Sequence, residues 1–106
     1  MSKTTVNLST TNLDNLPKRK AVYAIFAQNK DTKEPINCRY VGETDNLEER
    51  TKTHFSDNES NEKLREFMQS DKTVMMVYEM LPDSDKKERL AKESEWINKY
   101  KPEYNK

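Results

Sequence analysis

The chain has 106 residues, the size of one domain, and only 32% of them are hydrophobic while 36% are charged, so its core must be small. Nineteen basic and nineteen acidic residues cancel, which argues against a protein that finds DNA or a membrane by bulk charge alone. The single cysteine, Cys38, cannot form an internal disulfide, and no apolar run is long enough for a signal peptide or a transmembrane helix. We therefore expect a soluble cytoplasmic protein with no membrane partner.

The first half of the chain predicts a loose N-terminus followed by a hairpin. Residues 1–17 are rich in Ser, Thr and Asn and are expected to form a flexible leader before a single folded domain over residues 18–106. Residues 21–27 are β-branched and aromatic, as in a strand, and residues 38–42 predict a second short strand. The polar residues 29–37 between them predict a loop, so the two strands are expected to pair as an antiparallel hairpin.

The second half predicts three helices and one more strand. Two capping-box patterns, Asp45 with Glu48 and Asp85 with Glu88, predict the starts of helices that end near Phe55 and Tyr100. A further helix is expected over residues 61–69 and a buried strand over residues 73–80. The expected fold is α/β (α+β), with a small, mainly antiparallel, three-stranded sheet flanked by helices.

The only glycine and the only histidine of the chain lie close together in sequence, at Gly42 and His54. A lone glycine indicates either a positive φ or a close approach of another group to the backbone. Histidine is the side chain that titrates near neutrality. In the first predicted helix, Arg50 lies one turn from His54, at the edge of the inward side. This segment is therefore the first place to look for chemistry.

A carboxylate interrupts the apolar side of the last predicted helix. Leu90, Trp96, Ile97 and Tyr100 define that side, and Glu93 falls within it. A glutamate in a core-facing position is costly unless it is paired or bound to a metal. Two interpretations stay open: a buried ion pair, for example with Arg50 or a lysine, or a role as a ligand or catalytic group.

Together these residues resemble the GIY-YIG nuclease domain over residues 21–105. Tyr40-Val41-Gly42 matches the second signature element, and the first appears as Ala21-Val22-Tyr23, with its tyrosine kept and its glycine lost. The family's helix arginine, frequent histidine, metal-binding glutamate and C-terminal asparagine match Arg50, His54, Glu93 and Asn105. No single tripeptide is specific, but the ordered set at suitable spacings is.

The resemblance implies a metal-dependent DNA endonuclease, a hydrolase that cleaves phosphodiester bonds with a single Mg²⁺ or Mn²⁺ ion. It implies that Glu93 holds the ion, that Arg50 contacts the scissile phosphate, and that Tyr23 and Tyr40 position or deprotonate the attacking water, with His54 sharing the proton transfer. Gly42 and Asn105 are expected beside the substrate, Asn105 also as a structural tie at the mouth of the site.

Two other functions remain open. One is a catalytically inactive module that binds nucleic acid or protein, in which Tyr23 and Tyr40 merely pack and Arg50 forms a surface ion pair. The other is a catalytic subunit that depends on a DNA-targeting partner protein. Zero net charge and the lack of a DNA-reading module favour both, whereas the retained set of Tyr, Arg, His and Glu opposes the first.

Overall fold

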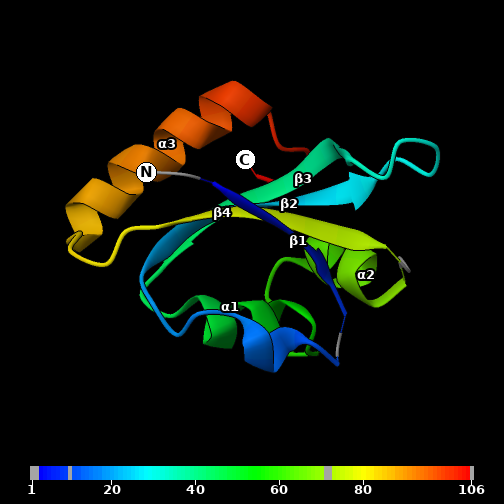
Figure 1. Cartoon of the computed structure of the whole chain (residues 1–106), viewed down its shortest axis with the longest axis horizontal. Helices are drawn as coiled ribbons and strands as arrows, with labels where there is room; N and C mark the ends of the chain where they lie inside the picture. The colour runs from blue at the N-terminus through cyan, green and yellow to red at the C-terminus, as the bar shows by residue number, and fades with distance from the viewer. Residues whose placement is uncertain (1–2, 10, 71–72, 106) are drawn as a thin grey trace.

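The computed structural model of the chain describes residues 3–9, 11–70 and 73–105. The elements in chain order are β1 (Thr4–Leu8), η1 (Leu13–Asn15), β2 (Ala21–Gln28), β3 (Pro35–Thr44), α1 (Leu47–His54), α2 (Glu62–Ser70), β4 (Val74–Met80) and α3 (Lys86–Tyr100). Four strands form one antiparallel sheet in the order β1-β4-β2-β3, with α3 on one face and α1 and α2 on the other (Figure 1). Among the described residues, no helix is both long enough and apolar enough to cross a membrane.

The expected three-stranded sheet and flexible leader are both wrong for the described residues, because Thr4–Leu8 forms a fourth strand. It pairs with β4 in antiparallel register, from Thr4 opposite Tyr78 to Leu8 opposite Val74. The sequence does not predict this strand because four of its five residues are polar or only partly buried. Its contribution to the hydrophobic core comes almost entirely from Leu8. Pairing with the open edge of β4 supplies the backbone hydrogen bonds that such a short segment cannot supply alone.

The predicted hairpin is confirmed and is longer than expected. β2 and β3 pair from Ala21 opposite Thr44 to Gln28 opposite Pro35, so the connection spans residues 29–34 and not the expected 29–37. β2 is a central strand whose residues 21–26 are all buried. Because side chains alternate between the two faces of a strand, Tyr23 and Ile25 point to the layer of α1 and α2, while Val22 and Ala24 point to α3.

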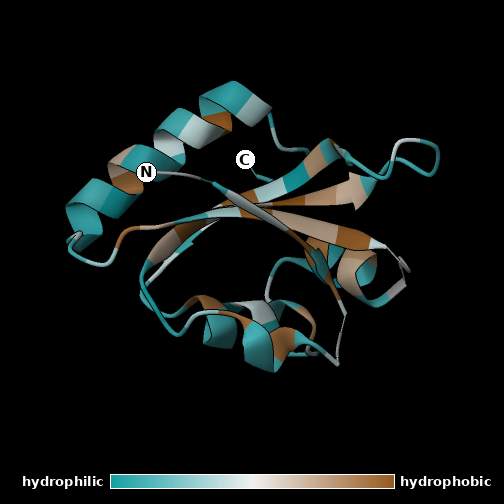
Figure 2. Cartoon of the chain, viewed as in Figure 1, coloured by the Kyte–Doolittle hydropathy of each residue, from teal (hydrophilic) through white to brown (hydrophobic). Residues whose placement is uncertain are grey.

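Two hydrophobic clusters lie on the two faces of the sheet, visible as brown segments of strands and helices in Figure 2. The larger cluster packs Leu47 of α1 and Leu64 of α2 against β2 and β4. The smaller one holds Trp96, the largest fully buried side chain on α3. Leu90, which was expected on the inward side of this helix, is 44% exposed, because Arg89 and Trp96 form the buried side instead.

The helix caps confirm one capping box and correct the other. Asp85 caps α3, accepting from Glu88 N at 2.8 Å and donating its own N–H to the Glu88 carboxylate at 3.1 Å. At α1 the cap is Asn46 rather than Asp45, since its side-chain oxygen accepts from Glu49 N at 3.0 Å. Asn is as good a cap as Asp, so the pattern alone could not choose between neighbours.

The C-terminal segment returns along β3. Lys101 adopts a left-handed conformation that ends α3, and the backbone N–H groups of Glu103 and Tyr104 then donate to the carbonyl oxygens of Cys38 and Arg39 at 3.0 and 2.7 Å. This return brings Asn105 next to the Tyr40-Val41-Gly42 run.

Candidate active site

Gly42 serves a close approach between a side chain and the backbone. It lies directly opposite Tyr23 in the β2–β3 pair, and its φ is not positive. A Cβ at Gly42 would lie 2.5 Å from Tyr23 Oη, 2.7 Å from Tyr23 Cζ and 2.9 Å from Tyr40 Cε2. Both tyrosine rings therefore rest on the bare backbone of this residue. Gly42 itself is buried under them, so the predicted substrate contact at Gly42 stays a prediction.

Tyr23 and His54 form a hydrogen bond in the interior. The distance from Tyr23 Oη to His54 Nε2 is 2.6 Å, and both side chains are fully buried. Tyr40 adds an edge-on ring contact, its centroid 5.3 Å from that of His54. The three groups come from β2, α1 and β3, so only the packing of α1 against the sheet brings them together.

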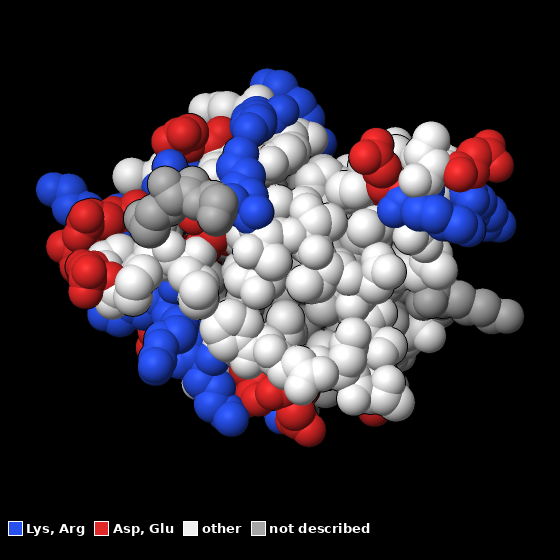
Figure 3. Space-filling model, viewed as in Figure 1, with Lys and Arg blue, Asp and Glu red and all other residues white. Residues whose placement is uncertain are grey.

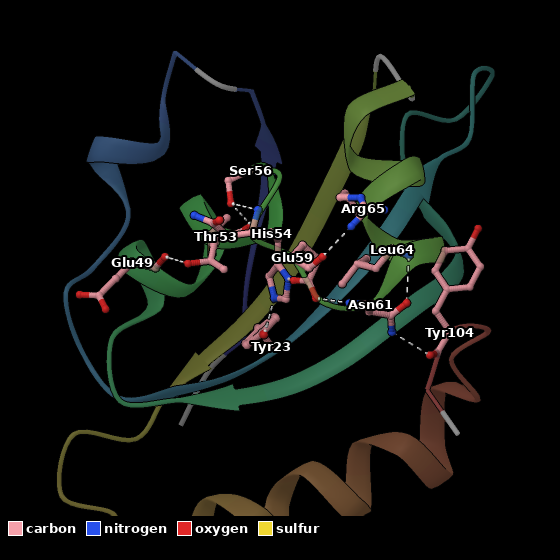
Figure 4. A network of polar contacts seen from close by, with 12 residues as sticks. Tyr23, Glu49, Thr53, His54, Ser56, Glu59, Asn61, Leu64, Arg65 and Tyr104 are labelled. Atoms are coloured by element: carbon pink, nitrogen blue, oxygen red, sulfur yellow. Dashed lines mark hydrogen bonds and ion pairs between the residues drawn. The ribbon is translucent and has the colours of Figure 1, made fainter.

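A residue that the sequence did not single out, Glu59, completes this cluster (Figure 4). Its carboxylate contacts His54 Nδ1 through one oxygen, and the other accepts from Asn61 N at 2.9 Å. Its exposed fraction is only 2%. In sequence it is one acidic residue in a polar stretch after α1, and its single signal was its place five residues after the lone histidine, which is too weak to separate it from surface glutamates.

The ionisation states follow from burial and neighbouring charge. Burial raises the pKa of Tyr23 well above 10, and Tyr40 raises it further. The positive charge of Arg50 lowers the pKa of Tyr23 but does not outweigh these two effects. Burial lowers the pKa of His54 below its ordinary value even though Glu59 opposes this. Burial also disfavours ionised Glu59, but hydrogen bonds from His54 and Asn61 outweigh it and lower the pKa of Glu59 to about 2. At neutral pH the cluster is therefore a neutral phenol, a neutral imidazole and a carboxylate.

Arg50 supplies the positive charge of the site. Its half-buried guanidinium lies beside the hydroxyl groups of Tyr23 and Tyr40, where it lowers both phenol pKa values against the larger effect of burial. The described part of the chain shows no ion pair for Arg50. Instead, Arg50 lines an open cleft of about 730 Å³ between α2 and the C-terminal segment, together with Tyr40, Glu59, Ser60, Asn61, Glu62, Lys63, Glu66, Glu103, Tyr104 and Asn105.

Glu93 is half-buried on α3 and lies near Tyr40. Burial is the main cause of the raised pKa of Tyr40, and the charge of Glu93 adds a smaller increase. Burial and then the Glu43 carboxylate raise the pKa of Glu93. Glu43 is itself occupied, with Arg89 Nε at 3.0 Å and Lys86 Nζ at 2.5 Å. No ion pair of Glu93 occurs within the described ranges, so the ion-pair interpretation finds no partner there.

The surroundings of Glu93 fit a divalent cation. A carboxylate whose ionised form is disfavoured by burial and by a second carboxylate is stabilised when a cation approaches. Mg²⁺ is commonly held by only one or two carboxylates, with water completing its octahedron. Within the described residues no group of three or more His, Cys, Asp or Glu side chains converges as a metal site, and a Mg²⁺ ion does not require one.

Asn105 ties the chain end to β3. Its Oδ1 accepts from Val41 N at 2.7 Å and its Nδ2 donates to Val41 O at 2.9 Å, so the amide pairs with the backbone of Val41 as a strand would. Asn61 adds a second tie, from its Nδ2 to Tyr104 O at 3.1 Å. Asn105 also lines the cleft, while its contact with substrate stays a prediction.

The sequence from residue 19 to residue 105 matches the family described as the GIY-YIG catalytic domain. The chain belongs to the GIY-YIG family. No curated protein matches it with significance.

Among solved structures, the fold is similar to the GIY-YIG N-terminal endonuclease domain of UvrC from Thermotoga maritima bound to its catalytic divalent cation, magnesium. The TM-score is 0.58 at 22% identity, covering 91% of this chain and 93% of that one. A point mutant of the UvrC domain bound to its catalytic divalent cation gives the same TM-score at 21% identity, with the same coverage. These likenesses establish the GIY-YIG fold of the chain.

Proposed function

We propose that the protein is a metal-dependent DNA endonuclease, a cytoplasmic hydrolase that cleaves phosphodiester bonds with one divalent ion held by Glu93. The observation that carries the proposal is the convergence of four side chains on one side of the sheet. Tyr40 and Arg50 line a cleft open to solvent, and the buried pair of Tyr23 and His54 lies beside them. An inactive module would gain nothing from keeping a buried phenol–imidazole pair beside an arginine that forms no ion pair with any described residue.

Tyr23 and His54 share the removal of a proton from the attacking water. Tyr23 is protonated at neutral pH because burial raises its pKa, so it cannot act as a base while it keeps its own proton. His54 is neutral, and its Nε2 lies 2.6 Å from Tyr23 Oη. The phenol therefore accepts the proton of water as it passes its own to the imidazole.

Arg50 and Tyr40 act on the phosphate. The guanidinium is permanently charged and forms paired hydrogen bonds with two phosphate oxygens more readily than any other side chain. Burial raises the pKa of Tyr40, so its hydroxyl group stays protonated. The hydroxyl donates a hydrogen bond to the attacking water or to a phosphate oxygen. Both groups reach the cleft, where a phosphate can approach them.

Glu93 holds the divalent ion, Mg²⁺ or Mn²⁺. When bound, the ion stabilises the negative charge that develops on the phosphate and on the leaving oxygen. The carboxylate needs to be ionised for this role, and its raised pKa makes binding of the ion weaker as the solution becomes more acidic.

DNA is the proposed substrate, and a DNA-targeting partner supplies part of the affinity. The net charge is zero, and the face shown in Figure 3 is largely uncharged across its centre, where the uncharged strand β1 lies, with charged side chains around its margin. This face would neutralise few phosphates, and because the net charge of the whole chain is zero, the isolated domain should bind DNA weakly.

Cleavage of supercoiled plasmid and of branched and flapped DNA, with Mg²⁺ or Mn²⁺, tests the proposal. Wild type is compared with Glu93→Ala and Arg50→Ala, and with Glu95→Ala as a matched control, since Glu95 is an exposed glutamate on the same helix. Metal-dependent nicking that is lost in the first two variants and kept in the control is expected.

Two results would count against this function. Cleavage that survives Glu93→Ala would contradict the metal site and indicate a contaminating nuclease. A folded wild type that cleaves no substrate, even when it is fused to a sequence-specific DNA-binding domain, would favour the inactive interaction module instead.

A further inference from the structure

We propose that Glu59 is a positioning residue for this reaction: its carboxylate fixes the proton of the neutral His54 ring on Nδ1 and leaves Nε2 free to accept the hydroxyl proton of Tyr23. The proposal rests on the function proposed above and adds a residue that the motif does not contain. It makes Tyr23, His54 and Glu59 one chain of three groups, buried from end to end.

The hydrogen bonds determine the tautomer. An ionised carboxylate can only accept, so the ring nitrogen that contacts it must carry a hydrogen. His54 Nδ1 contacts Glu59 Oε1, and the Nε2 atom on the other side of the ring faces Tyr23 Oη at 2.6 Å. With Nδ1 protonated, a neutral imidazole has its lone pair on Nε2, and the phenol is the donor.

The position of Glu59 is itself fixed. Its second carboxylate oxygen accepts from Asn61 N at 2.9 Å, and its backbone carbonyl accepts from Arg65 Nη1 at 3.2 Å. Both carboxylate oxygens thus have a donor, which keeps Glu59 ionised at an exposed fraction of 2%, with a pKa of about 2. A buried carboxylate with both oxygens so engaged is a rigid support for the ring.

The proton balance closes within the chain of three groups. As the water oxygen bonds to phosphorus, one water proton moves to Tyr23 Oη and the former hydroxyl proton moves to His54 Nε2. The resulting imidazolium is paired with the Glu59 carboxylate. The bond from phosphorus to the leaving oxygen breaks, and this oxygen takes a proton from solvent. Because His54 is fully buried, its extra proton returns through Tyr23 Oη, which lies beside the cleft-lining residues Arg50 and Tyr40.

The substitution Glu59→Gln tests the proposal because one side-chain amide oxygen cannot accept both hydrogen bonds that the Glu59 carboxylate accepts. Asn61 N–H and His54 Nδ1–H are both donors, whereas the amide has one oxygen. The backbone N–H of Asn61 is always a donor, but the imidazole of His54 can carry its proton on Nε2 instead of Nδ1. Glu59→Gln therefore favours the tautomer in which Nε2 donates to Tyr23 Oη, and proton transfer from the phenol is blocked.

The experiment is nitrogen NMR on protein labelled with ¹⁵N in the imidazole of histidine. His54 is the only histidine of the chain, so the spectrum reports this ring alone and needs no assignment. Wild type, Glu59→Gln and Glu49→Gln are measured at neutral pH, together with kcat and KM for DNA cleavage. Glu49 is an exposed glutamate on α1, the helix that carries His54, and it does not line the cleft, so it is the matched control.

We expect the Nδ1–H tautomer in wild type and in Glu49→Gln, and the Nε2–H tautomer in Glu59→Gln. We also expect kcat of Glu59→Gln to fall by about 100-fold or more, the usual contribution of general acid–base catalysis, with little change in KM. A wild-type ring protonated on Nε2, or an unchanged tautomer in the Glu59 variant, would overturn the proposal.

The spectrum separates this inference from the function on which it rests. A wild type that cleaves nothing but shows the Nδ1–H tautomer overturns the nuclease proposal and leaves the positioning of the ring by Glu59 supported. If Glu59→Gln does not fold, the wild-type spectrum alone decides, because an Nε2–H ring in wild type is incompatible with the chain of three groups.

Discussion

Replacing Gly42 with alanine would place a methyl group where the rings of Tyr23 and Tyr40 already lie. The new Cβ would be 2.5 Å from Tyr23 Oη, and ordinary contact begins at 3.4 Å, so the hydroxyl must retreat by about 0.9 Å. If it retreats along the bond to His54 Nε2, the 2.6 Å hydrogen bond is compressed, and if it retreats away from His54 the bond lengthens to about 3.5 Å, beyond hydrogen-bond range. Either movement spoils the geometry of proton transfer.

The energetic consequence combines two opposing effects. Overpacking a buried site costs about 1–3 kcal/mol, while alanine restricts the unfolded chain and returns about 0.4–1 kcal/mol where the backbone allows it. The φ of Gly42 is not positive, so the second effect applies. We expect a net loss of about 1–2 kcal/mol in the free energy of unfolding, and a loss of activity of about 100-fold, as for a misplacement of about 1 Å.

Urea denaturation and a DNA nicking assay measure the two quantities on the same preparation of Gly42→Ala. The double variant with Tyr23→Phe is the control for the mechanism, because removing the hydroxyl takes away the nearest obstacle and leaves only Cζ at 2.7 Å and Tyr40 Cε2 at 2.9 Å. A coupling free energy of about 0.5–1 kcal/mol is expected between the two positions. A Gly42→Ala protein that is as stable and as active as wild type would refute the reasoning from close approach.

Three further predictions concern the metal, the pH dependence and the first strand. Glu93→Gln should leave the melting temperature of the metal-free protein unchanged or slightly higher, since burial and a neighbouring carboxylate disfavour its charge, and should abolish the increase that Mg²⁺ gives wild type; an equal increase in both would contradict the metal site. Burial lowers the pKa of His54 below 6.5, so the unfolded chain takes up this proton first and the free energy of unfolding should fall as the pH drops below about 6.5. Urea titrations between pH 7 and pH 5 check this, with the decrease much smaller in His54→Asn. Leu8→Ala should cost about 2–4 kcal/mol, measured by urea denaturation beside the exposed Thr5→Ala, which should cost less than about 0.5 kcal/mol; equal costs would mean that β1 does not contribute to the core.

Local patterns were sufficient for most of the elements. The hairpin of β2 and β3, the helices α1 to α3 and the buried strand β4 each have a period or a cap that any chain with these residues would display. The close approach at Gly42 was one of two readings that a lone glycine allows, and Glu93 was marked because a charge on the inward side of a helix is costly wherever it occurs. The ordered motif then identified the family without any knowledge of distances.

Neither strand β1 nor the role of Glu59 could be predicted from the sequence, for the same physical reason. A short polar segment becomes a strand only when a partner edge is free, and the open edge of β4 is created by the order of the whole sheet. Glu59 looks like any surface glutamate until the turn after α1 folds it beneath His54. Local sequence determined which residues could do chemistry here, whereas tertiary packing decided which of them meet, because contacts between distant segments depend on how all the elements pack together.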